Sequence, residues 1–128
     1  MSEINFFALG VSVVTAFFAS FIWYTMLAKV RARLSPSTSQ KPDLSLILGE
    51  LVKNTILAFV LGYLVSRLGI RIFAEVFHLS LLLWIAFPVL ILASSVMYEK
   101  VPLKLAAIHA GDWTIKILLM CTILALWR

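Results

Sequence analysis

The sequence predicts an all-α membrane protein, folded as an up-and-down bundle of four transmembrane helices. Hydrophobic residues make up 62% of the 128-residue chain, and the mean hydropathy is +1.04. Soluble domains contain only roughly 45 to 50% apolar residues. The apolar residues form long runs, with room for about four crossings of roughly 20 residues each. We therefore expect residues 1–128 to form a single transmembrane domain in contact with the lipid bilayer.

The first two predicted spans flank a basic loop. They extend over about residues 4–27 and 44–68, and residues 28–43 lie between them. This loop contains Ser35-Pro36-Ser37-Thr38-Ser39, a composition typical of turns. We expect the first span to be retained, because its apolar run is longer than the roughly 7 to 15 residues of a signal-peptide core.

The last two predicted spans, about residues 79–97 and 103–127, form an antiparallel hairpin around the turn Glu99-Lys100-Val101-Pro102. The segment before them, residues 70–77, alternates polar and apolar faces at helical spacing, and we expect it to lie along the membrane surface. Pro88 lies midway along the third span and has no backbone N–H to donate, so it leaves the Trp84 carbonyl free. This predicts a kink.

The basic residues predict the orientation of the chain. The first and third loops lie on the same side, and basic loops are typical of the cytoplasmic side. We expect a multi-pass protein of the inner (plasma) membrane with both termini outside. The net charge of +5 is explained by this asymmetry, so we do not expect nucleic acid as a partner. The basic residues of the two loops are Lys29, Arg31, Arg33, Lys41, Lys100 and Lys104.

Small residues recur at every fourth position in the predicted spans. Examples are Ala58, Gly62 and Ser66 in the second span, and Ala107 with Gly111 in the fourth. Such stripes let helix backbones approach closely and gain dispersion contacts. They favour close packing of helices within one chain, and a homo-oligomer stays open as an alternative.

Polar side chains inside two of the spans mark the candidate functional site. A charge near the bilayer centre costs at least about 2.5 to 3.5 kcal/mol by insertion scales, so such a group usually faces a partner or a wet cavity. We call these residues the intramembrane polar network: Glu50, Lys53 and Asn54 in the second span, and His109, Asp112 and Lys116 in the fourth.

The depths of these residues predict how they pair. The second and fourth spans enter from the same side, and Lys53 and Asp112 each lie about 14 Å beyond the start of their span. We therefore expect Lys53 to pair with Asp112, and Glu50 to contact His109 one turn closer to the cytoplasm. Asp112 also precedes Lys116 by four residues, the favourable order for an ion pair within a helix.

Two functions stay open for this network. A compensated set of acids and bases would fasten the helices together. The protein would then be a non-enzymatic accessory or self-associating membrane subunit, either a homo-oligomer or part of a membrane complex. The alternative is an oligomeric proton-coupled transporter or ion-conducting protein, because a histidine near a carboxylate titrates around neutral pH. A bound pigment or haem at His109 is disfavoured, since no second histidine is suitably spaced.

Motifs of enzyme chemistry are missing from the sequence. It has no cysteine pair, no metal-spaced set of His and carboxylates, no Gly-rich phosphate loop and no nucleophile elbow. Cys121 is the single cysteine and is interpreted as a small apolar filler of the fourth span. We therefore expect no enzymatic activity, no cofactor and no metal.

Several short motifs carry a resemblance to a known family: Ile4-Asn5-Phe6 at the start, the Trp23-Tyr24 pair, the acidic turn at Glu99 and the run from Lys104 to Gly111. Over nearly its whole length the chain resembles the small, mostly bacterial, four-span membrane proteins of the domain of unknown function 1761 family. That family usually has Ser-Pro after the Trp-Tyr pair, where this chain has Thr25-Met26, and Asn-Ala-Gly-Tyr where this chain has His109-Ala110-Gly111-Asp112. The resemblance implies the architecture and no activity, and it implies that the His109 and Asp112 pair is particular to this sequence.

Overall fold

The computed structural model describes residues 5–34 and 44–127, which are mostly helical and contain no strand. Four helical stretches are long and apolar enough to cross a membrane, which confirms the predicted all-α four-helix bundle. The turn predicted at residues 35–39 lies outside the described residues. The elements are α1 (Phe6–Met26), α2 (Ala28–Leu34), α3 (Leu44–Leu68), α4 (Phe73–Trp84), the π-helical turn η2 (Ile85–Val89), α5 (Leu90–Tyr98) and α6 (Leu103–Leu126).

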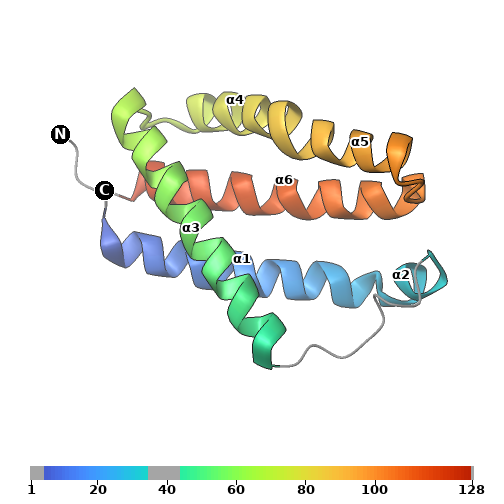
Figure 1. Cartoon of the computed structure of the whole chain (residues 1–128). Helices are drawn as coiled ribbons and strands as arrows, with labels where there is room; N and C mark the ends of the chain where they lie inside the picture. The colour runs from blue at the N-terminus through green and yellow to red at the C-terminus, as the bar shows by residue number, and fades with distance from the viewer. Residues whose placement is uncertain (1–4, 35–43, 128) are drawn as a thin grey trace.

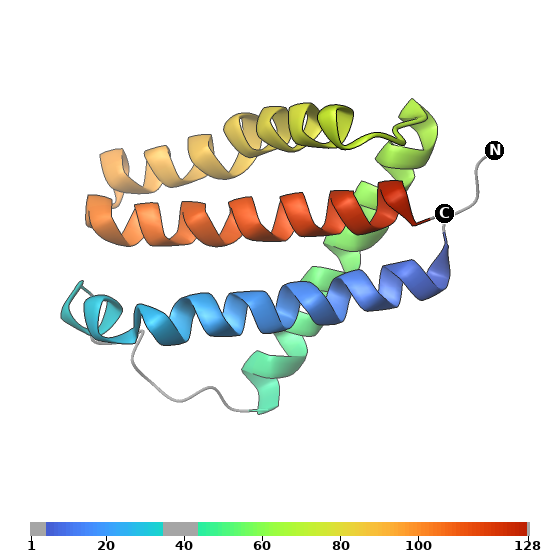
Figure 2. The same cartoon turned by 180° about the vertical axis from the view of Figure 1, so that it is seen from behind.

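Helix α6 is the centre of the bundle. It packs against α1, α3 and the continuous stretch from α4 to α5. Figures 1 and 2 show α6 lying between α1 and the α4–α5 stretch, while α3 crosses α1 and α6 obliquely. Within the described residues the backbone of α3 does not come close to that of α4 or α5. The core therefore forms along α6, where Ile117, Met120 and Cys121 are buried against small residues of α1 and α3 such as Ala16 and Ala58.

Local sequence signals explain where the helices begin and end. The Asn5 side-chain oxygen accepts hydrogen bonds from the backbone N–H groups of Phe7 (3.0 Å) and Ala8 (3.2 Å), which caps the start of α1. Helix α3 ends at Leu68 and is followed by Gly69, whose φ of 66° lies in the left-handed region that glycine adopts without strain. The Ile70 N–H then bonds back to the Val65 carbonyl at 3.1 Å, as in a Schellman motif.

The third span differs from the prediction at its start. Residues 70–77 do not form a separate surface segment, because α4 begins at Phe73 and continues without interruption into the span. The tight turn at Gly69 leaves only residues 69–72 between α3 and α4. Val76 is fully buried in the core, so this first part of α4 is held by the bundle.

Pro88 lies in the third span within η2, the π-helical turn of Ile85–Val89. Proline removes one backbone donor and its ring crowds the preceding turn, and a locally wider turn accommodates both effects. The sequence predicted a kink at Pro88, and the structure places a π-helical turn there, one of the usual causes of helix bending.

Candidate functional site

A buried ion pair on α6 forms the centre of the candidate site. Asp112 and Lys116 lie four residues apart and hence on one face of the helix. Their residues are only 2% and 4% exposed, and the Asp112 Oδ2 to Lys116 Nζ distance is 3.1 Å. The structure therefore confirms the ion pair that the sequence predicted within the fourth span.

Helix α1 supplies hydroxyl groups to Asp112. The Ser20 hydroxyl donates a hydrogen bond to Oδ1 at 2.5 Å, and the Tyr24 hydroxyl lies 3.3 Å from Oδ2 as a second donor. Ser20 and Tyr24 are also four residues apart, so both side chains leave the same face of α1. Both oxygens of the Asp112 carboxylate thus have partners. The prediction of the network missed these two residues.

Lys116 connects the ion pair to α3. Its Nζ lies 3.7 Å from the Glu50 Oε2 and 5.2 Å from the centre of the Trp113 ring. Glu50 also accepts a hydrogen bond from Lys53 at 2.9 Å. The charged side chains thus alternate in sign across two helices, in the order Asp112, Lys116, Glu50, Lys53. We call these four residues the ion cluster.

The pairings predicted between the second and fourth spans are wrong. Lys53 pairs with Glu50 rather than with Asp112, and Glu50 reaches Lys116 rather than His109. The prediction assumed that the two spans run side by side, so that equal depths would meet. Because α3 crosses α6 obliquely, Glu50 instead meets α6 further along the chain, at Lys116 (Figure 1).

His109 lies against α1. Its Nδ1 is 2.8 Å from the Tyr24 hydroxyl, and the two rings are 5.7 Å apart. Tyr24 also faces Asp112, so its hydroxyl stands between the histidine and the carboxylate.

Asn54, the remaining member of the predicted network, is buried in α3 and only 2% exposed. Its Nδ2 has no hydrogen-bond partner within the described part of the chain.

A family model described as "Protein of unknown function (DUF1761)" matches residues 7–125. The chain belongs to this family. Neither the curated proteins nor the solved structures contain a match to the chain. Membership agrees with the resemblance found in the sequence and assigns no activity.

The Trp23-Tyr24 pair, one of the motifs that resemble DUF1761, contributes both of its side chains to contacts with α6. While Tyr24 faces the cluster, the Trp23 indole N–H donates to the Ile108 carbonyl at 2.9 Å. A Cβ added at Gly111 would overlap the Trp23 ring, so only glycine fits there without a shift.

Trp84 approaches α6 from α4. Its indole N–H donates to the Ala110 carbonyl at 2.9 Å. Together with the Trp23 bond, this places indole donors from two neighbouring helices on α6 carbonyls two residues apart.

The residues of the small-residue stripes have different environments. Ala58 and Gly62 are buried in α3, and Ser66 is intermediate. Ala107 is exposed, so the Ala107 and Gly111 stripe meets a neighbouring element through Gly111 and the Trp23 ring.

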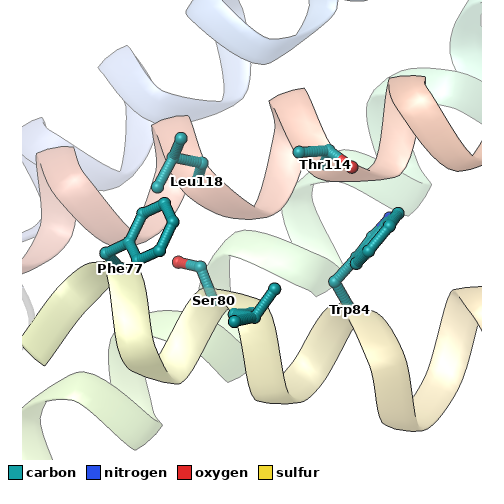
Figure 3. Close-up of a pocket in the computed structure, with 6 residues that line it drawn as sticks. Phe77, Ser80, Trp84, Thr114 and Leu118 are labelled. Atoms are coloured by element: carbon teal, nitrogen blue, oxygen red, sulfur yellow. The ribbon is translucent and has the colours of Figure 1, made fainter.

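Two hollows lie beside α6, and neither is lined by a residue of the ion cluster. A small one of about 130 Å³ lies between α4 and α6, where Figure 3 shows Ser80 and Trp84 on α4 opposite Thr114 and Leu118 on α6. A larger groove of about 460 Å³ separates α3 from the α4–α5 stretch and is almost wholly apolar. Within residues 5–34 and 44–127, no group of three or more His, Cys, Asp or Glu side chains is arranged to hold a metal ion.

Proposed function

We propose that this DUF1761 member is a non-enzymatic, self-associating or accessory subunit of the inner (plasma) membrane. In this proposal the ion cluster fixes how three of its helices pack. The observation that carries it is the burial of Asp112 and Lys116 with partners from α1, α3 and α6 of the same chain. A charge set compensated in this way is what a stable bundle needs in lipid.

The energetics of buried ion pairs favour a structural role for the ion cluster, in which it holds helices α1, α3 and α6 in one arrangement, over a catalytic role. A buried ion pair gains little net free energy over apolar residues of the same size, because desolvation offsets the attraction. Breaking the pair is costly, however, so wrong helix rotations that separate Asp112 from Lys116, Ser20 or Glu50 are disfavoured. The cluster would thus select one packing of α1, α3 and α6.

The outer edge of the cluster supports association with another chain. The Glu50 and Lys53 side chains are 43% and 62% exposed, although both lie within a candidate membrane span. Charged groups in membrane spans usually face protein or water rather than lipid. A neighbouring subunit would shield this pair.

Native mass spectrometry after mild extraction tests the proposal. We expect the protein to be recovered either as a homo-oligomer or with a second protein at fixed stoichiometry. Recovery of a monomer alone, at the lowest detergent concentration that keeps the protein dispersed, would contradict it. Absorption spectra of the same sample would reveal a bound pigment or haem, which the proposal does not include.

Proton transfer by an oligomer is a second candidate, and one observation favours it. The polar contacts form a continuous series from His109 through Tyr24, Asp112 and Lys116 to Glu50. Chains of acids, bases and histidine inside membranes are typical of proton relays.

Proton flux into liposomes carrying a pH-sensitive dye tests this candidate. Flux that disappears in Glu50→Gln, and persists in the matched variant Glu99→Gln in the exposed turn before α6, would support transport. If liposomes that contain the unmodified protein show the same proton flux as empty liposomes, proton transfer is excluded as the function.

A further inference from the structure

We propose that the N-terminal half of α3, residues 44–53, is the surface on which a second copy of this chain docks, with the Glu50 and Lys53 side chains pairing across the interface. This inference rests on the self-association in the proposed function and names its surface and partner. The surface is defined by what the fold leaves uncovered and by the charges placed there.

The described residues cover the N-terminal half of α3 only in part: Leu51 packs against the core and Glu50 contacts Lys116, while most of the other positions are exposed. None of residues 44–53 is buried, whereas the buried positions of α3 begin at Asn54 and continue to Val65. In Figures 1 and 2 this end of α3 projects away from the rest of the bundle. Leu46 and Val52 on this segment are more than half exposed.

The charge on this surface identifies the partner. Glu50 and Lys53 are one turn apart and form a pair of opposite sign. In a two-fold dimer each copy presents the same surface, so Glu50 of one copy faces a surface that carries Lys53, and the reverse also holds. Opposite charges meet in both directions, and the surface is therefore complementary to itself.

Lipid is a poorer match than a second copy. A headgroup anion would satisfy Lys53 but would be repelled by Glu50, which lies 2.9 Å from it. Acyl chains offer neither group a partner. A second α3 offers both charges, and Gly49 leaves room for it, because a Cβ added there would meet nothing within 4 Å.

Cysteine cross-linking in native membranes tests this surface. Cys121 is the single cysteine, so Cys121→Ser supplies a cysteine-free background. We expect Gly49→Cys and Val52→Cys in that background to form disulfide-linked dimers on mild oxidation. Leu82→Cys is the matched control on α4, where the residue is similarly exposed at 52%, and it should remain monomeric.

Charge variants in the Gly49→Cys background test the pairing itself. We expect Lys53→Gln to lower the cross-linked fraction by about tenfold, as two lost interhelical pairs of ordinary strength would. Lys53→Arg should restore it. Arg67→Gln, which removes an exposed cation at the other end of α3, should leave it unchanged.

The outcomes separate this inference from the proposed function. Dimers that cross-link equally at Leu82→Cys would contradict docking through residues 44–53. An oligomer with no cross-link at residues 49 and 52 would contradict it as well. Either result would still be compatible with self-association through another surface. A product in which Gly49→Cys joins a protein of different mass would replace the second copy by an unlike partner. A monomer with no cross-link at any position would overturn both.

Discussion

Replacing Asp112 by asparagine is expected to destabilise the folded protein by about 3 kcal/mol. The substitution keeps the shape of the side chain and removes its charge, so Lys116, which is 4% exposed, loses the carboxylate 3.1 Å away. Breaking a buried ion pair by neutralising one partner typically costs about 3 to 5 kcal/mol. We expect the lower end of that range, because the Glu50 carboxylate stays 3.7 Å from Lys116.

A double-mutant cycle in a mild detergent measures this coupling. The free energies of unfolding of Asp112→Asn, Lys116→Met and the double variant are compared by circular dichroism during unfolding. The double variant should lose clearly less stability than the sum of the two single variants, because it leaves neither charge of the pair uncompensated. Strictly additive losses, or an Asp112→Asn variant as stable as the unmodified protein, would refute the fastening role of the pair.

Three further predictions concern the surroundings of the ion cluster, and the same unfolding measurement checks each of them. Gly111→Ala should lose about 1 to 3 kcal/mol, because the new methyl group overlaps the Trp23 ring, and unchanged stability would show that the ring moves freely. Trp84→Phe keeps an aromatic ring but removes the donor to the Ala110 carbonyl, and should cost about 0.5 to 1.5 kcal/mol; a gain in stability would contradict this. Asn54→Leu removes a buried amide nitrogen that has no hydrogen-bond partner among the described residues, so the free energy of unfolding should stay the same or rise. A clear loss of stability would show that the Asn54 side chain makes a stabilising contact.

Hydropathy predicted the architecture because the bilayer leaves a chain few choices. Backbone groups in lipid must be paired within a helix or a closed barrel, so a long apolar run predicts a spanning helix. Three of the four stretches accordingly begin within about two residues of the prediction. The third begins earlier, at Phe73, because periodicity cannot distinguish a surface helix from the first turns of a span.

The contents of the site were only partly predictable. Charge inside an apolar run flagged Glu50, Asp112 and Lys116, which the structure brings together. Serine is common in membrane helices and tyrosine is typical of their ends, so Ser20 and Tyr24 gave no comparable signal. A hydroxyl pair four residues apart on one span, with a charged residue on another, is the pattern that would have found them.

The wrong pairings have a different physical origin. Depth along two helices predicts contacts only if their axes are nearly parallel, and the crossing angle depends on which side-chain ridges interlock. In α3 the close-packed positions are Ala58, Leu61 and Val65, near its C-terminal end, and the N-terminal half diverges from the bundle (Figure 1). Hydropathy carries no information about that angle.

One stretch of α6 receives polar contacts from three of the helices that pack against it, α1, α3 and α4. Helix α1 reaches it with hydroxyl donors and an indole, α4 with a second indole, and α3 with a carboxylate. Apolar packing in lipid discriminates weakly between rotations of a helix, since lipid tails are as apolar as the side chains they replace. Polar contacts discriminate strongly, because a buried group that misses its partner keeps its full desolvation cost. If the ion cluster has the fastening role proposed above, the carbonyls of Ile108 and Ala110 and the side chains of Asp112 and Lys116 would fix the rotation of α6, and the positions of its neighbours would follow from that rotation.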